Sequence, residues 1–374
     1  MEISGTLQHG PRRPLPSPQL ALQRTLELGL FAVFPVIIPL AMAAYLTGAW
    51  GHGVMLFDLN TMWTAGRLVA HGHSAYPYYL YPAPAAVLMA PLGALPWTAA
   101  VAVWWAISVG ALLLTLHLLG VEDWRCYGAV FASSLAMWGL EIGTITPLLT
   151  LAAAAAWRYR DRPWGVAFAI AFVIGTKLFL WPLAVWLIAT KRYRAALCSV
   201  LATVVFTVGC WAVIGFDGFL AYPHIIGHVA SLVQDSSFSV LALVKALGIT
   251  GLGARLLSLI VAVVALAFVF RAARGANGDR RAFAWAIGAA LLISPIVWAH
   301  YYLLLFVPIA IATRRLSVLW LLPLAYWVLP HTAANGSIVV LTCGLGLTLF
   351  ILAACGEWPV SLRTGRRVAP GTVA

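Results

Sequence analysis

Long apolar stretches alternate along this sequence with short polar segments. Several of the stretches are close to the length of a membrane-spanning helix, namely residues 26–47, 99–119, 195–214, 252–270 and 338–355. Shorter apolar segments at 127–141 and 144–157 predict two further helices. A water-soluble core cannot use so many uninterrupted apolar stretches. The pattern therefore predicts an all-α membrane protein.

Two longer segments, 163–190 and 282–313, each have room only for a pair of short spans or a re-entrant hairpin. Residues 81–97 contain four prolines, and this density predicts a broken, interfacial helix rather than a clean span. We expect a polytopic helical bundle of about 10–12 spans over residues 26–355. Residues 48–98 would form a long first outer loop that includes the interfacial segment.

Composition supports the membrane class and excludes several others. The 374 residues are 63% hydrophobic and 9% charged, whereas soluble domains carry about 25% charged residues. The net charge of +12 does not indicate nucleic-acid binding, because the basic residues lie in small clusters between apolar segments. The five cysteines show no metal-ligand spacing, and the sequence contains no nucleotide-binding loop or metal-ligand cluster, so we expect no metal site and no cofactor.

The basic clusters predict the orientation of the chain in the membrane. They are centred on Arg12–Arg24, Arg158–Arg162, Lys191–Arg194, Arg271–Arg281, Arg314–Arg315 and Arg363–Arg367. Positive residues are retained in the cytoplasm, so the number of spans between successive clusters should be even. We expect cytoplasmic tails at 1–25 and 356–374, both termini inside, and a bacterial plasma membrane as the location.

With this orientation the outer face holds few ionisable groups, and these are candidates for function because charge at membrane depth is costly. Seven of the nine histidines fall on this side: His52, His71, His73, His224, His228, His300 and His331. Each charged candidate also has a simpler explanation. Asp58 could be a solvated loop charge, Lys177 a lysine that reaches the interface, Glu141 a helix end, and Arg67 a surface charge.

An ordered set of short motifs resembles glycosyltransferase family 87. The first outer loop contains Phe57-Asp58-Leu59, Ala65-Gly66-Arg67, His71-Gly72, Tyr76-Pro77 and Tyr81-Pro82. Later come Lys177-Leu178 with Pro182, the basic run Lys191–Arg194, and Ser294-Pro295-Ile296 with Trp298 and His300. The chain departs from the family pattern at Thr144, where glutamine is frequent, and at Tyr301, where a second histidine is frequent.

The resemblance implies a GT-C fold and a polyprenyl-phosphate-mannose-dependent mannosyltransferase. The enzyme would move a hexose, with mannose expected, from a polyprenyl-phosphate donor to a lipid or glycan acceptor of the cell envelope at the outer face. Asp58 would act as the base on the acceptor hydroxyl, and the anomeric carbon would be inverted. Lys177, His300 and Arg67 would hold the donor phosphate. Glu141, Tyr81 and Trp298 are weaker candidates for substrate binding.

Three other classes of protein fit parts of the sequence. A transporter or lipid flippase should carry polar residues at the middle of its spans, and these helices show few. Another GT-C enzyme, such as an arabinosyltransferase, fits the motifs as well. A structural membrane subunit would leave the outer aspartate, lysine and histidine unexplained.

Overall fold

The computed structural model describes residues 18–37, 41, 56–275, 277–330, 332–333 and 336–357. These ranges consist of helices joined by turns and loops and contain no β-strand, which confirms the all-α prediction. Most of the two predicted tails lies outside the described residues, as do His52, His331 and the end of the predicted span 26–47.

Five helices are long and apolar enough to cross a membrane, so the chain is a multi-pass membrane protein. They are Gln19–Ile37, α5 (Trp97–Leu118), α11 (Tyr193–Val213), α14 (Gly251–Ala272) and α18 (Ile338–Glu357). The segment Gln19–Ile37 begins one residue into α1 (Pro18–Leu28) and includes η1 (Gly29–Val33). A sixth span results if a helix pair bent by 58° counts as one, namely α12 (Tyr222–Val233) with η3 (Gln234–Ser236), followed by α13 (Val240–Ala246).

Shorter helices occupy the other segments that were expected to span. Residues 124–158 form α6 (Trp124–Ala132), α7 (Ser134–Glu141) and α8 (Thr146–Arg158). The first predicted hairpin is α9 (Pro163–Thr176), η2 (Leu178–Leu180) and α10 (Pro182–Ala189), and the second is α15 (Gly278–Ile293), η4 (Ala299–Leu305) and α16 (Phe306–Ala312). The chain continues through α17 (Val318–Leu321) and η5 (Leu322–Val328). A total of about 10–12 spans requires these shorter helices to cross in pairs.

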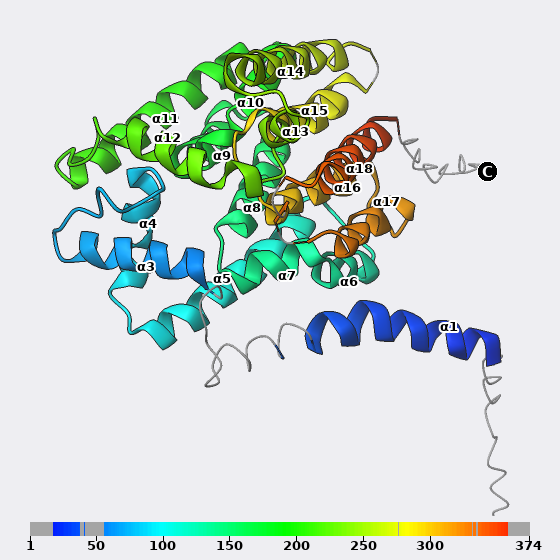
Figure 1. Cartoon of the computed structure of the whole chain (residues 1–374). Helices are drawn as coiled ribbons and strands as arrows, with labels where there is room; N and C mark the ends of the chain where they lie inside the picture. The colour runs from blue at the N-terminus through cyan, green and yellow to red at the C-terminus, as the bar shows by residue number, and fades with distance from the viewer. Residues whose placement is uncertain are drawn as a thin grey trace, which may run out of the picture.

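The described part of the predicted first outer loop, residues 56–98, is largely helical. It contains α3 (Phe57–Ala70) and α4 (Ala83–Gly93), which pack closely against each other. A Cβ atom at Gly66 would overlap the backbone of Met89, and one at Gly93 would overlap the backbone of Arg67, so two glycines permit this approach. Within the proline-rich segment 81–97, the helix α4 is short and ends before Pro96. Helices α3, α4 and α12 lie at one end of the bundle, away from the end of α18 (Figure 1).

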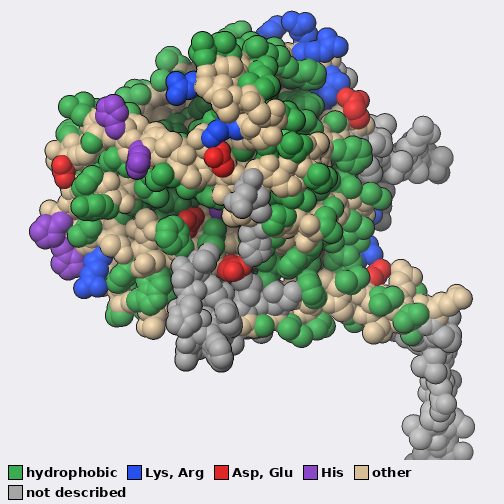
Figure 2. Space-filling model, viewed as in Figure 1, with side chains coloured by type: hydrophobic (Ala, Val, Ile, Leu, Met, Phe, Trp, Pro, Cys, Tyr) green, Lys and Arg blue, Asp and Glu red, His purple; other side chains and the backbone are tan. Residues whose placement is uncertain are grey.

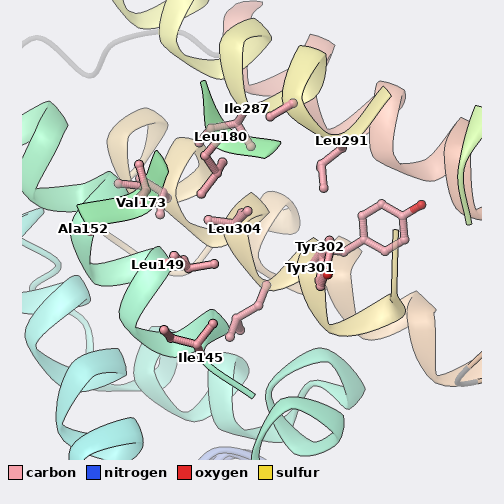
Figure 3. Packing of buried hydrophobic residues seen from close by; sticks show 14 of the residues in the cluster. Ile145, Leu149, Ala152, Val173, Leu180, Ile287, Leu291, Tyr301, Tyr302 and Leu304 are labelled. Atoms are coloured by element: carbon pink, nitrogen blue, oxygen red, sulfur yellow. The ribbon is translucent and has the colours of Figure 1, made fainter. Parts of the chain in front are cut away.

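The core lies between α8, α9, α15 and η4. Leu149 of α8, Val173 of α9 and Ile287 of α15 are fully buried, and Leu304 of η4 lies among them (Figure 3). Tyr301 and Tyr302 come from the same short helix and are also buried (Figure 3). Because His300 is the second residue of η4, the packing of the apolar residues of this helix fixes the backbone around His300.

A network of charges joins the ends of several helices on the side of the basic clusters. Asp279, in the first turn of α15, accepts hydrogen bonds from Arg160, Arg192 and the indole of Trp186 at 2.8–3.0 Å. Arg160 lies between α8 and α9, and Arg192 precedes α11. In Figure 2 the histidines lie near one edge of the visible face, whereas the densest group of Lys and Arg lies at the upper right.

Candidate active site around Asp58

Asp58 lies in the first turn of α3, and the end of α7 holds that turn in place. The backbone N–H of Leu56 donates to the carbonyl of Glu141 at 2.9 Å, and the N–H of Asp58 donates to the carbonyl of Ile142 at 3.0 Å. The first N–H groups of a helix have no partner within it, so α7 supplies the missing acceptors. A carboxylate is also stabilised at a helix N-terminus by the helix dipole.

Gly143 makes this junction possible. Its φ of +67° lies in the left-handed region, and a Cβ there would collide with the Cβ of Leu59 in α3. The indole N–H of Trp104 in α5 donates to the Gly143 carbonyl at 2.9 Å. Three elements, α3, α5 and the end of α7, therefore meet at one glycine and set the position of Asp58.

Tyr81 contacts Asp58 from the loop that precedes α4. Its hydroxyl donates to Oδ2 of Asp58 at 3.0 Å, and the hydroxyl of Tyr76 donates to the backbone carbonyl of Tyr81 at 2.7 Å. Burial raises the pKa of Tyr81 well above its usual value, and the negative charge of Asp58 raises it further. Tyr81 is therefore a neutral hydrogen-bond donor to the carboxylate.

Lys177 approaches the same place from the turn between α9 and η2. Its Nζ lies 4.1 Å from the ring centre of Tyr301 and 5.2 Å from that of Tyr81, within the range of cation–π attraction. Phe179 stacks on Tyr301 with ring centres 4.9 Å apart. Burial lowers the pKa of Lys177 to about 8, and the carboxylate of Asp58 opposes this effect.

His300 is buried next to this lysine. The residue is 3% exposed, its ring meets Tyr301 edge-on at 4.9 Å, and the positive charge of Lys177 acts on it. Among the described residues, its Nε2 atom has no hydrogen-bond partner. A buried polar atom without a partner is costly, so it is available for a bound ligand.

The other predicted site residues take different places. Glu141 contributes its backbone carbonyl to the start of α3, while its side chain is only partly buried. Trp298 is partly buried against the core just before η4. Arg67 is exposed and stacks on Trp63 at 5.4 Å, nine residues after Asp58 in the same helix. Nine residues of α-helix span about 13.5 Å, so α3 holds Arg67 away from Asp58.

Two tyrosines at the site were not expected from the sequence. Tyr301 replaces a histidine that is frequent in the family, and its ring covers the ammonium group of Lys177. Tyr79 is 2% exposed, and its hydroxyl has no hydrogen-bond partner among the described residues. For Tyr79 the available signal was its place in the run of tyrosines from Tyr76 to Tyr81, whose two ends belong to the predicted motif. The described residues contain no group of three His, Cys, Asp or Glu side chains arranged as metal ligands.

Comparison with known proteins relates this chain to a family. The model of glycosyltransferase family 87 matches residues 79–295, more than half of the chain. The chain is 26% identical over 314 residues to a polyprenol-phosphate-mannose-dependent alpha-(1-2)-phosphatidylinositol pentamannoside mannosyltransferase of Mycobacterium tuberculosis, covering 75% of this chain and 68% of the relative. The protein of the same name from Mycolicibacterium smegmatis is 27% identical over 306 residues, covering 72% and 66%.

No solved structure matches the chain. The family match extends from Tyr79, in the loop of residues 76–81 (the tyrosine loop), through Lys177 to Pro295, and both relatives are mannosyltransferases by name. Together with the membrane helices, it confirms the resemblance seen in the sequence. The chain therefore belongs to glycosyltransferase family 87, and it is a membrane glycosyltransferase.

Proposed function

We propose that this enzyme transfers mannose from polyprenyl-phosphate mannose to a lipid acceptor of the cell envelope, with inversion at the anomeric carbon. Both relatives carry this donor in their names, which also name a phosphatidylinositol pentamannoside. We further propose that the site opens to the outer face and that both termini are cytoplasmic. The distribution of basic clusters supports this orientation.

One observation carries the proposal. Asp58 and Lys177 come from distant parts of the chain, and both contact Tyr81. The hydroxyl of Tyr81 donates a hydrogen bond to Asp58, and its ring lies against the ammonium group of Lys177. Within the described residues Lys177 has no carboxylate at ion-pair distance, so its charge is available to an anionic ligand. A base beside a free cation is what sugar transfer from a lipid phosphate requires.

In the proposed reaction the acceptor hydroxyl oxygen forms a bond to the anomeric carbon, while the bond from that carbon to the phosphate oxygen breaks. The electron pair leaves with the polyprenyl phosphate, and the hydroxyl proton passes to Asp58. The leaving phosphate is already anionic and needs charge stabilisation rather than a strong acid. Lys177 would supply a positive charge there, and the unpaired Nε2 of His300 a hydrogen bond.

The test uses the purified chain in lipid nanodiscs with polyprenyl-phosphate [14C]mannose and phosphatidylinositol mannosides. We expect a radiolabelled, extended glycolipid, and no product when GDP-mannose replaces the lipid donor. Polyprenyl-phosphate glucose and a polyprenyl-phosphate arabinose serve as competing donors, because the same site chemistry fits other GT-C enzymes. Transfer from the arabinose donor alone would overturn the choice of sugar. Absence of transfer from all of these donors would overturn the proposed function.

A further inference from the structure

We propose that Tyr81 is a positioning residue that holds the Asp58 carboxylate through Oδ2, leaves Oδ1 to act as the base, and keeps Lys177 beside it. The inference rests on the proposed function, since it assigns atoms within the same reaction. Tyr81 acts through Asp58 in this assignment and not by direct contact with the substrate.

The hydrogen bonds of Asp58 define which of its oxygens is free. In the described part of the chain, the hydroxyl of Tyr81 is the single side-chain partner of this carboxylate, and it binds Oδ2. The backbone N–H of Asp58 is already used by the carbonyl of Ile142. The hydrogen bond to Oδ2 restricts rotation of the carboxylate, and Oδ1 has no side-chain hydrogen-bond partner among the described residues, so it is the oxygen left to take a proton.

Tyr81 is itself fixed from two sides. The hydroxyl of Tyr76 donates to its backbone carbonyl at 2.7 Å, and its ring lies 5.7 Å from that of Tyr79. Tyr76 in turn stacks on Trp211 of α11 at 4.9 Å. Residues 76–81 therefore connect α11 to the carboxylate of Asp58. A rigid donor holds a catalytic group more precisely than a mobile one.

The ring and the hydroxyl of Tyr81 have separate partners. The ring lies 5.2 Å from the ammonium group of Lys177, while the hydroxyl binds Asp58. A phenol that donates to a carboxylate gains electron density in its ring, which strengthens its attraction for a cation. Tyr81 thus separates the two opposite charges by one aromatic ring and prevents a direct ion pair that would occupy both groups.

A pair of variants separates these two contacts. Tyr81→Phe keeps the ring and removes the hydroxyl. A hydrogen bond to a charged group is worth about 1.5–3 kcal/mol, so we expect kcat to fall about 10- to 100-fold with the donor KM nearly unchanged. Tyr81→Leu removes both contacts, and we expect the donor KM to rise as well. Tyr127→Phe is the matched control. The Tyr127 hydroxyl donates to the backbone carbonyl of Val121 in another part of the bundle, so wild-type kinetics are expected.

A pH profile distinguishes positioning from a merely structural role. Removing a donor from an ionised carboxylate disfavours the ionised form. We therefore expect the acid limb of kcat/KM to lie at higher pH in Tyr81→Phe than in the wild type. The other titratable groups that act on or lie beside Asp58 are Tyr79, Lys177, Tyr301 and Glu141. All of them are intact in this variant, so the shift reports the lost hydroxyl.

A double-mutant cycle with Asp58→Asn completes the test. If Tyr81 acts through Asp58, adding Tyr81→Phe to Asp58→Asn should change kcat by less than about 3-fold. Wild-type kcat and an unmoved acid limb in folded Tyr81→Phe would overturn the inference while leaving the proposed function standing. An inactive wild type would instead overturn the function. If Tyr81→Phe does not fold, Tyr76→Phe loosens the Tyr81 backbone instead, and an unchanged acid limb there would also count against the inference.

Discussion

The backbone N–H of Asp58 donates to the carbonyl oxygen of Ile142 at 3.0 Å, and this bond ties the start of α3 to the end of α7. The bond satisfies one of the otherwise unpaired N–H groups at the start of α3. It also places the carboxylate of Asp58 where the tyrosine loop, Lys177 and η4 converge. Backbone contacts between segments that are far apart in the sequence thus position Asp58, and side-chain contacts of Tyr81 and Tyr301 bring Lys177 beside it.

Asp58→Asn tests the proposed base. The amide keeps the size of the side chain and an oxygen that can accept from Tyr81, but it cannot take the acceptor proton. Catalysis by a positioned base is worth about 10²–10⁴-fold, so mannosyl transfer should fall by that factor. Donor affinity, measured by equilibrium binding of the labelled lipid, should stay within a few-fold. Turnover close to that of the wild type would refute the assignment of Asp58.

Lys177→Ala tests the proposed phosphate contact. Loss of the ammonium group should raise the donor KM about 10-fold or more, because a hydrogen bond between charged groups is lost. Lys245→Ala is the control, because Lys245 pairs with the exposed Asp235 at 2.6 Å in another part of the chain. If both variants show the same donor KM, Lys177 does not bind the phosphate.

The pKa of Lys177 gives this contact a pH dependence with a defined sign. Burial lowers the pKa to about 8. The group is therefore cationic below pH 8 and loses its charge as the pH rises through that value. In the wild type the donor KM should rise above about pH 8, and Lys177→Arg should remove this rise because arginine stays protonated. A donor KM that stays flat to pH 9.5 would contradict the prediction.

Gly143→Ala tests the junction that positions Asp58. The positive φ and the neighbouring Leu59 both disfavour a side chain there, so we expect a loss of about 1–3 kcal/mol of stability and a lower Tm in detergent. Gly110→Ala is the matched control. It lies within α5 with open space around it, so it should be neutral or slightly stabilising. Equal Tm values for the two variants would contradict the assigned role of Gly143.

Asp279→Asn tests the charge network near the basic clusters. The carboxylate accepts from Arg160, Arg192 and Trp186, and removing its charge weakens all three contacts. We expect a loss of about 1–3 kcal/mol, measured by thermal unfolding. Asp235→Asn should cost under about 0.5 kcal/mol, because this carboxylate is 61% exposed. A larger loss of stability in Asp235→Asn than in Asp279→Asn would contradict this prediction.

The sequence by itself determined the class of this protein. Apolar stretches such as 99–119 and 252–270 have no use in water, so they predict helices with little help from context, and these became α5 and α14. The sequence alone also marked Asp58 as a candidate, because the motif around it is local. The sequence likewise predicted that residues 81–97 do not form a long continuous helix, because proline restricts the conformation of its own backbone.

The tertiary structure decided which candidates share a site. Lys177 lies beside Tyr81, the hydrogen-bond partner of Asp58, and His300 lies beside Tyr301. The turn after α9 and the helix η4 pack into one core, and such contacts leave no periodic signal in the sequence. Arg67 belongs to the same local motif as Asp58, yet the helical rise carries it about 13.5 Å away along α3. The role of Tyr81 depends on a hydroxyl placed 3.0 Å from a carboxylate, and only the packed fold fixes that distance.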